Sequence, residues 1–173
     1  MRRVDNSIHR SFDRLVAQGD APMWVVTTLA GGVRAGCLVG FGAQVGIEPR
    51  RFLVCLSKNN YTYEVAERAT HLAVHLLGED GLALAQLFGA ETGAEIDKFE
   101  HCEWRPGPHR LPILAAASAW LTGKILQRID FGDHVGYLLS PTAAETPGDG
   151  PSLRFHSVAN LPPGQPADPV ETN

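Results

Sequence analysis

Strand-like segments follow one another along this chain with little more than tight turns between them. Residues 21–45 predict two strands joined by a hairpin at Gly31-Gly32, and residues 119–131 and 133–140 predict a second hairpin. Strands joined by such short turns pair antiparallel, because a parallel pair needs a long crossover connection. We therefore expect a mainly β fold with peripheral helices, in the form of an antiparallel barrel.

The remaining elements fit around these hairpins. Strands are predicted at residues 50–57 and 71–77 with an edge strand at 152–158, and helices are predicted at 7–17, 62–69 and 81–90. No G-x-G-x-x-G sequence follows a predicted strand, so the pattern gives no support to the doubly wound dinucleotide-binding fold.

Composition limits the class of protein. The 173 residues suffice for one domain with a real core, and the net charge of −4 provides no basic face for nucleic acid. No segment approaches the roughly 18 apolar residues of a membrane helix, and no export signal is recognised. Three cysteines without C-x-x-C spacing argue against a disulfide framework or a zinc ribbon. We expect a soluble cytoplasmic protein with one domain at 1–155 and a proline-rich tail at 156–173.

The polar stretch that follows the strand at 50–57 suggests a binding site. The sequence S-K-N-N at residues 57–60 leads directly into a helix, with Thr62 as the expected N-cap. The unpaired N–H groups of a first helical turn, a lysine ammonium and Ser and Asn side chains can together hold a phosphate. The same residues also suit an ordinary capped helix beside a solvated lysine. Both interpretations remain open at this point.

Histidines are the other candidates for chemistry. His134 opens a strand in a G-D-H sequence, where it could steer a nicotinamide or a proton, or be a plain exposed turn residue. His71 and His75 have the spacing of a helical metal pair, but their segment alternates like a strand, which favours structural roles. The H-C-E-W sequence at 101–104 has no partner cluster, and no G-x-S-x-G motif is present. We expect no metal site.

Taken in order, these motifs resemble a known family. The stretches that carry the resemblance lie between about Met23 and Phe155 and read AGCLVGFGAQVGIEPRRFLVCLSKNNYTYEVAE, HLAVHLL, LAQLFGAETGAEIDKF, WRPGPHRLPIL and GDHV. Their series is similar to the flavin reductase-like FMN-binding split-barrel family. The patterns K-x-N-Y-T and F-G-x-x-[ST]-G-x-x-x-D-K-F look closest to its flavoredoxin-like and rubredoxin-associated members, which hold FMN tightly.

The resemblance implies a six-stranded antiparallel Greek-key split barrel, and a homodimer with flavin at the subunit interface. Members bind FMN or FAD, reduce it with NADH or NADPH, and often supply reduced flavin to a partner monooxygenase. By that likeness the expected cofactor-binding residues are Cys37, Leu38, Val39, Gly40 and Gln44 along the isoalloxazine and ribityl chain, Ser57, Lys58, Asn60 and Thr62 at the phosphate, and Lys98 beside the cofactor loop. His134 is the expected catalytic residue, near the nicotinamide.

The chain also departs from the family pattern. Many reductases carry a polar T-A-N-S type run where this chain has Leu38, Val39, Gly40 and Phe41, so hydroxyl contacts to the flavin are lost. Main-chain groups can still bind the pyrimidine edge, and Gly40 lets the backbone approach closely. The departure bears on flavin affinity and flavin type.

Three functions are therefore open. The first is an NAD(P)H-dependent flavin reductase, in which hydride passes from nicotinamide to the flavin N5. The second is an electron-transfer flavoprotein that keeps its FMN and exchanges electrons with a redox protein. The third is a flavin-binding module without turnover. The resemblance chooses neither NADH nor NADPH, and it leaves FAD or a deazaflavin as alternatives to FMN.

Overall fold

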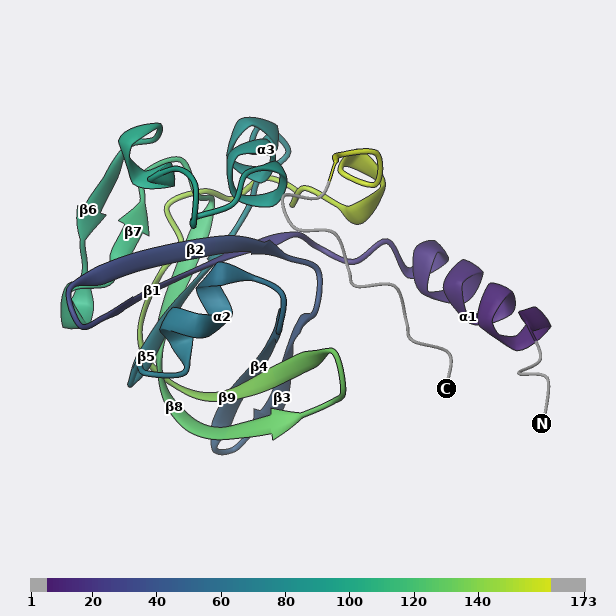
Figure 1. The fold of residues 1–173 in the computed structure, drawn as a ribbon, viewed down its shortest axis with the longest axis horizontal. Helices are drawn as coiled ribbons and strands as arrows, with labels where there is room; N and C mark the ends of the chain where they lie inside the picture. Colours follow the sequence, from purple (N-terminus) through teal and green to yellow (C-terminus); the bar gives the residue numbers. More distant parts are fainter. Residues whose placement is uncertain (1–5, 163–173) are drawn as a thin grey trace.

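The computed structural model describes residues 6–162, in which one strongly curved antiparallel sheet forms the body of the molecule (Figure 1). The order across this sheet is β2-β1-β5-β8-β9-β4-β3. Its strands are β1 (Trp24–Ala30), β2 (Val33–Val39), β3 (Gly42–Ile47), β4 (Arg50–Ser57), β5 (His71–Leu76), β8 (Ala119–Asp130) and β9 (His134–Glu145). A separate short hairpin consists of β6 (Trp104–Pro106) and β7 (Pro112–Leu114).

Three α-helices accompany the sheet: α1 (Asn6–Gly19), α2 (Tyr61–Ala66) and α3 (Leu82–Ala90). Single 3₁₀ turns follow at Lys98–Glu100, Pro108–Arg110 and Phe155–Ser157. Helix α2 lies inside the curve of the sheet, whereas α3 lies outside it, over β2 (Figure 1). Both faces of the β1–β2 region are therefore covered.

Two buried clusters follow from this arrangement. Strand β4 alternates, so Phe52, Val54 and Leu56 point into the inner cluster, which the side chains of α2 close. On β1 the neighbours Val25 and Val26 are both fully buried, because one faces α3 and the other faces the inside of the sheet. A strand that is covered on both faces has a nearly continuous apolar sequence, and the start of β1 follows this pattern.

The tight turns have the glycines that they need. Gly31 and Gly32 have φ of 56° and 79° in the β1–β2 hairpin, and Gly132 has φ of 109° between β8 and β9. This left-handed region strains most other residues, so glycine fixes where each hairpin turns.

The mainly β fold with peripheral helices is confirmed, but the expected count of six strands is not reproduced, since seven strands join the sheet. The edge strand expected at 152–158 was wrong. Only Ser152 and Arg154 form isolated bridges there, and a 3₁₀ turn begins at Phe155. The helix expected at 62–69 already ends at Ala66.

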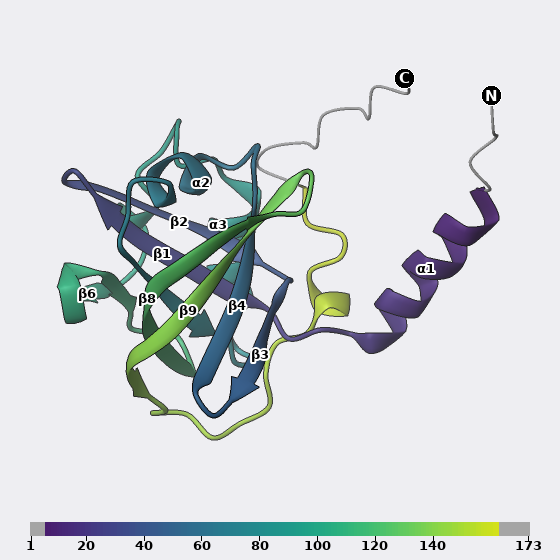
Figure 2. The ribbon, with the colours of Figure 1, turned by 90° about the horizontal axis from the view of Figure 1, so that it is seen from below.

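Helix α1 extends away from the sheet in both views (Figure 1, Figure 2). None of its side chains is buried, and Ile8, Phe12, Leu15 and Val16 are exposed. Of the helices within residues 6–162, none combines the length and apolar character required to cross a lipid bilayer.

Candidate flavin site

A cleft of about 760 Å³ lies between one end of the sheet and α1. Its walls come from the end of β2 and the link to β3, the end of β4 with the turn after it, the start of β9, and α1. Most of the lining side chains are apolar, and the polar ones are Asp13, Ser57, Asn60 and His134. Such an apolar cleft with a few polar groups is typical of a site for a small organic ligand.

Strand pairing brings these distant segments together. Ser57, the last residue of β4, is paired with His134, the first residue of β9. The Cys55 N–H donates to the Phe41 carbonyl oxygen at 2.9 Å, which holds the β2–β3 link against β4. The antiparallel register therefore places the S-K-N-N and G-D-H sequences beside the apolar run that follows Cys37.

The part of the cleft formed by β2 is apolar, and its one thiol is not ionised. Cys37 is buried, and this burial raises the pKa of its thiol to about 11, so the thiol stays protonated at neutral pH. Beyond it the Phe41 side chain is exposed, and its ring centroid lies 5.0 Å from that of His134. The Phe41 and His134 rings together offer a flat contact surface at the cleft.

The turn after β4 is held by its own side chains. The Asn60 Oδ1 accepts a hydrogen bond from the Thr62 N–H at 3.0 Å, so Asn60 is the N-cap of α2. The expectation that Thr62 is the N-cap was therefore wrong. Thr62 is buried within the helix, because the chain takes its extended cap conformation two residues earlier.

Lys58 stands in this turn without lining the cleft. Its Nζ lies 2.9 Å from both carboxylate oxygens of Asp130, at the end of β8. The Lys58 main-chain N–H also donates to the Asp133 carbonyl oxygen at 2.9 Å. Two contacts thus tie the turn to the β8–β9 hairpin.

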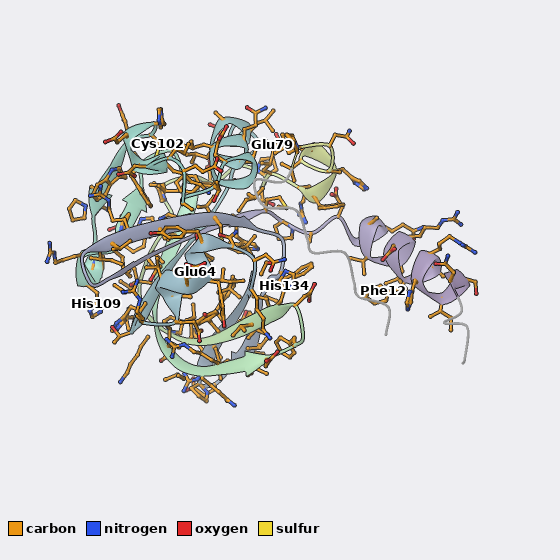
Figure 3. All side chains as sticks on the ribbon, in the orientation of Figure 1. Phe12, Glu64, Glu79, Cys102, His109 and His134 are labelled. Atoms are coloured by element: carbon orange, nitrogen blue, oxygen red, sulfur yellow. The ribbon has the colours of Figure 1, made fainter. Side chains whose placement is uncertain are left out.

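His134 lies on the side of the sheet that faces α1, which carries Phe12 (Figure 3). Its Nδ1 lies 2.9 Å from Asp133 Oδ1. The hydrogen bond from His134 lowers the pKa of the Asp133 carboxyl, which therefore stays ionised and orients the ring.

The cleft unites seven of the residues singled out from the sequence: Cys37, Leu38, Val39, Gly40, Ser57, Asn60 and His134. Gln44, Lys58, Thr62 and Lys98 lie outside its lining. Gln44 is exposed on β3 and donates to the Gly46 carbonyl oxygen.

Lys98 is buried, although a flavin contact was expected of it. Its Nζ donates to the carbonyl oxygens of Gly36 and Phe88, both at 3.1 Å. Burial lowers the pKa of this ammonium. Lys98 therefore fastens the loop after α3 to β2, and protein carbonyls already satisfy its charge.

Sequence reasoning missed several residues that line the cleft, among them Phe12 and Val16 of α1, Cys55, and Phe155. The helical spacing of Phe12 and Val16 predicts an apolar helix face, but it does not say what that face covers. Phe155 was assigned to a strand that does not form.

Three other histidines make contacts within the fold, away from the lining of the cleft. His75 is buried between the Val25 carbonyl oxygen at 3.0 Å and the Leu114 N–H at 3.2 Å. His71 stacks on His109 with ring centroids 3.6 Å apart. Across the described part of the chain, no group of three or more His, Cys, Asp and Glu side chains is placed to hold a metal ion.

Comparison with known proteins decides the family. Residues 19–158 match the model of the flavin reductase like domain, which is most of the chain. The chain belongs to the flavin reductase like family. The solved flavin reductase domain protein from Arthrobacter sp. FB24 shares 26% identity and a TM-score of 0.77, over 95% of this chain and 99% of that one.

Two relatives of this flavin reductase like chain have informative names. A "Probable flavin reductase" from Rhizobium meliloti (strain 1021) is 31% identical over 71% of this chain, which spans only 40% of that protein. An "FMN reductase (NADH) RutF" from Ancylobacter novellus is 28% identical over 86% of this chain and 84% of its own length. Further relatives are named as reductase components of monooxygenases.

The residues of the flavin reductase like chain fit a flavin. The apolar walls and the Phe41–His134 pair suit a flat ring system, and Gly40 adds no side chain at the β2 end. Ser57 and Asn60 supply polar groups at the cleft, and the neighbouring Lys58, outside its lining, carries an ammonium that is paired with Asp130. The chemistry of the donors therefore matches a ligand with an apolar ring and a phosphorylated tail.

Proposed function

We propose that this protein is an NAD(P)H-dependent flavin reductase, which binds FMN in the cleft and supplies reduced flavin to a partner monooxygenase. The observation that carries the proposal is the convergence of Ser57, Asn60, His134 and the segment 37–40 on one apolar cleft. The names of relatives support the reaction and the kind of partner. When bound, the flavin accepts hydride from the nicotinamide, which is chemistry that no protein side chain supplies.

The protein's own residues bind and orient. The β2 end and Phe41 would exclude water from one side of the ring system, and main-chain groups near Gly40 would bind its polar edge. Ser57, Lys58 and Asn60 would hold the phosphate, and His134 would position the nicotinamide. Positioning of this kind accounts for a large part of the rate enhancement in bimolecular reactions.

The proposal extends to the state of the protein. We propose a homodimer with a Greek-key split barrel, one domain over residues 1–155 and a cytoplasmic location. Free Cys37, Cys55 and Cys102 support a reducing compartment. The tail expected at 156–173 falls largely outside the described residues, which end at 162.

The test is an absorbance spectrum of the purified protein, followed by NADH and NADPH titration with and without added FMN, FAD and riboflavin. We expect nicotinamide oxidation that scales with added free flavin. A stoichiometric yellow protein that oxidises nicotinamide without added flavin would instead favour the electron-transfer flavoprotein. Absence of flavin binding would overturn the proposal.

A further inference from the structure

An ion pair stands beside the cleft, between Lys58 and Asp130. The Lys58 ammonium contacts both carboxylate oxygens of Asp130 at 2.9 Å, and the two side chains are 35% and 68% exposed. Exposed pairs of this kind contribute only about two- to fivefold to an equilibrium constant. The Lys58 ammonium can therefore leave Asp130 and pair with another anion at a small cost in free energy.

The hairpin between β8 and β9 aims the carboxylate of Asp130. Its Oδ1 also accepts the Gly132 N–H at 2.9 Å, and Gly132 has a φ of 109° that fits the turn. The hydrogen bond from the Gly132 N–H lowers the pKa of the Asp130 carboxyl most, and the Lys58 ammonium lowers it further, so the carboxyl is ionised at neutral pH. The negative charge is a fixed part of the turn.

Neither residue of the pair lines the cleft, but the turn that carries Lys58 borders its polar residues. Ser57 and Asn60, on either side of Lys58 in the chain, both line the cleft, and so does His134 of the same hairpin. A phosphate held by Ser57 and Asn60 would be bound by the two residues that flank Lys58, within reach of its long side chain if the ammonium left Asp130. The same ammonium would then face two competing anions.

We propose that Asp130 is an internal competitor for Lys58, which weakens the hold on the flavin phosphate so that FMN exchanges readily. The inference rests on the proposed function and deepens it. A carboxylate already on the ammonium must be displaced, and it repels the phosphate that replaces it. The contribution of Lys58 to the preference for FMN over riboflavin is therefore smaller than that of a lysine without a paired carboxylate. Weaker binding of FMN suits a reductase that releases its reduced flavin.

The test is a double-mutant cycle with Lys58→Ala and Asp130→Asn, read by fluorescence titration of FMN and riboflavin. The Asn amide oxygen can still accept the Gly132 N–H, so Asp130→Asn retains the turn. We expect Asp130→Asn to tighten FMN by about two- to fivefold with riboflavin unchanged. We also expect the gain to vanish in the Lys58→Ala background. Lys58→Ala should cost FMN more affinity in the Asp130→Asn protein than in the wild type.

Glu145→Gln is the matched control, because it removes a carboxylate of similar exposure from the ion pair with Arg105, away from the cleft. It should leave both affinities unchanged. Equal tightening of FMN and riboflavin by Asp130→Asn, or the same gain without Lys58, would overturn the inference and leave the proposed function standing. If neither flavin binds to the wild type or to any variant, the inference about Asp130 and the proposed function are both contradicted.

Discussion

His134 has two neighbours that set how it can act. Asp133 Oδ1 lies 2.9 Å from Nδ1, and the Phe41 ring lies against the imidazole, so the ring is oriented from two sides. Because Asp133 engages Nδ1, Nε2 is the nitrogen that remains for a ligand. An oriented histidine of this kind is suited to position a substrate or to take part in proton transfer.

The first prediction concerns this side chain. His134→Ala should slow flavin reduction by NADH or NADPH by about 10²-fold and no more than about 10⁴-fold, while FMN affinity changes little. Stopped-flow absorbance measures the reduction rate, and fluorescence titration measures the affinity. His101→Ala replaces an exposed histidine that does not line the cleft, and it should have no effect on either quantity. Unchanged reduction in His134→Ala would leave this histidine a turn residue only.

His75 gives a prediction about stability and pH. Burial lowers its pKa from 6.5 to about 4, so the folded protein holds it neutral. As the pH falls below 6.5, the His75 imidazole is protonated in the unfolded chain but stays neutral in the folded protein until the pH approaches 4. The free energy of unfolding should therefore fall by about 3 kcal/mol between pH 7.5 and pH 4. Urea unfolding of wild type and His75→Gln isolates this contribution, since the variant should lack it. Parallel pH profiles would show that other groups carry the dependence.

The residues of the candidate site were only partly predictable. Ser57, Asn60 and His134 were recognised because strand ends followed by polar turns are readable in a sequence, and strand pairing then brought them together. Lys98 was harder to interpret, because the sequence does not show whether a lysine meets a ligand or a carbonyl. Thr62 and Asn60 are both good caps, and the backbone conformation chooses between them.

Among the elements, α2 is a helix of six residues whose C-terminal end is contacted by an arginine of β8. Arg128 of β8 donates from Nη2 to the carbonyl oxygens of Ala66 and Ala69, at 3.0 and 2.8 Å. Its guanidinium also lies over the Tyr137 ring at 5.5 Å, and Tyr137 in turn donates to Glu67 at 2.6 Å. The end of α2 is thus fastened to the sheet by a charged donor.

Arg128→Met should lower the free energy of unfolding by about 1.5–3 kcal/mol, because carbonyls at the helix end lose a charged partner. Chemical denaturation measures the loss. Arg105→Met is the matched control: Arg105 also lies over an aromatic ring, that of Trp120, but its ion pair with Glu145 is exposed. It should cost less than about 1 kcal/mol. Equal losses in the two variants would show that the carbonyl contacts contribute little.

Elements with a strong period and clear turns were predictable, and those that depend on distant partners were not. Residues 152–158 have the composition of a strand, but their main chain meets the segments just before β1 and just after β5. The Met23 N–H donates to the Leu153 carbonyl oxygen, and the Leu153 N–H donates to the Leu77 carbonyl oxygen. Helix α1 shows the opposite case. Its periodicity predicts the helix, yet the local pattern does not tell what its apolar face meets.

At the scale of the molecule, apolar side chains gather on the outside. Besides those of α1, Val45 and Ile47 of the edge strand β3 are exposed, Ile47 by 79%. Monomeric proteins seldom leave such groups uncovered, and a two-fold partner would cover them.

We predict a homodimer that buries well over roughly 1,200 Å² in total. Light scattering at micromolar concentration should report twice the mass of the 18.7 kDa chain. The double variant Leu15→Glu/Ile47→Glu should be monomeric with an unchanged circular dichroism spectrum, because both side chains are exposed in the single chain. A monomeric wild type with flavin bound would contradict the prediction, and so would a dimeric variant.

The exposure of the Lys58–Asp130 pair also matters for how such proteins diversify. Neither side chain packs in the core, so replacing the carboxylate disturbs little of the fold. A change of one nucleotide converts an aspartate codon into an asparagine codon. A lineage could therefore adjust its flavin affinity by a few-fold through a single inherited substitution, without passing through a poorly folded protein.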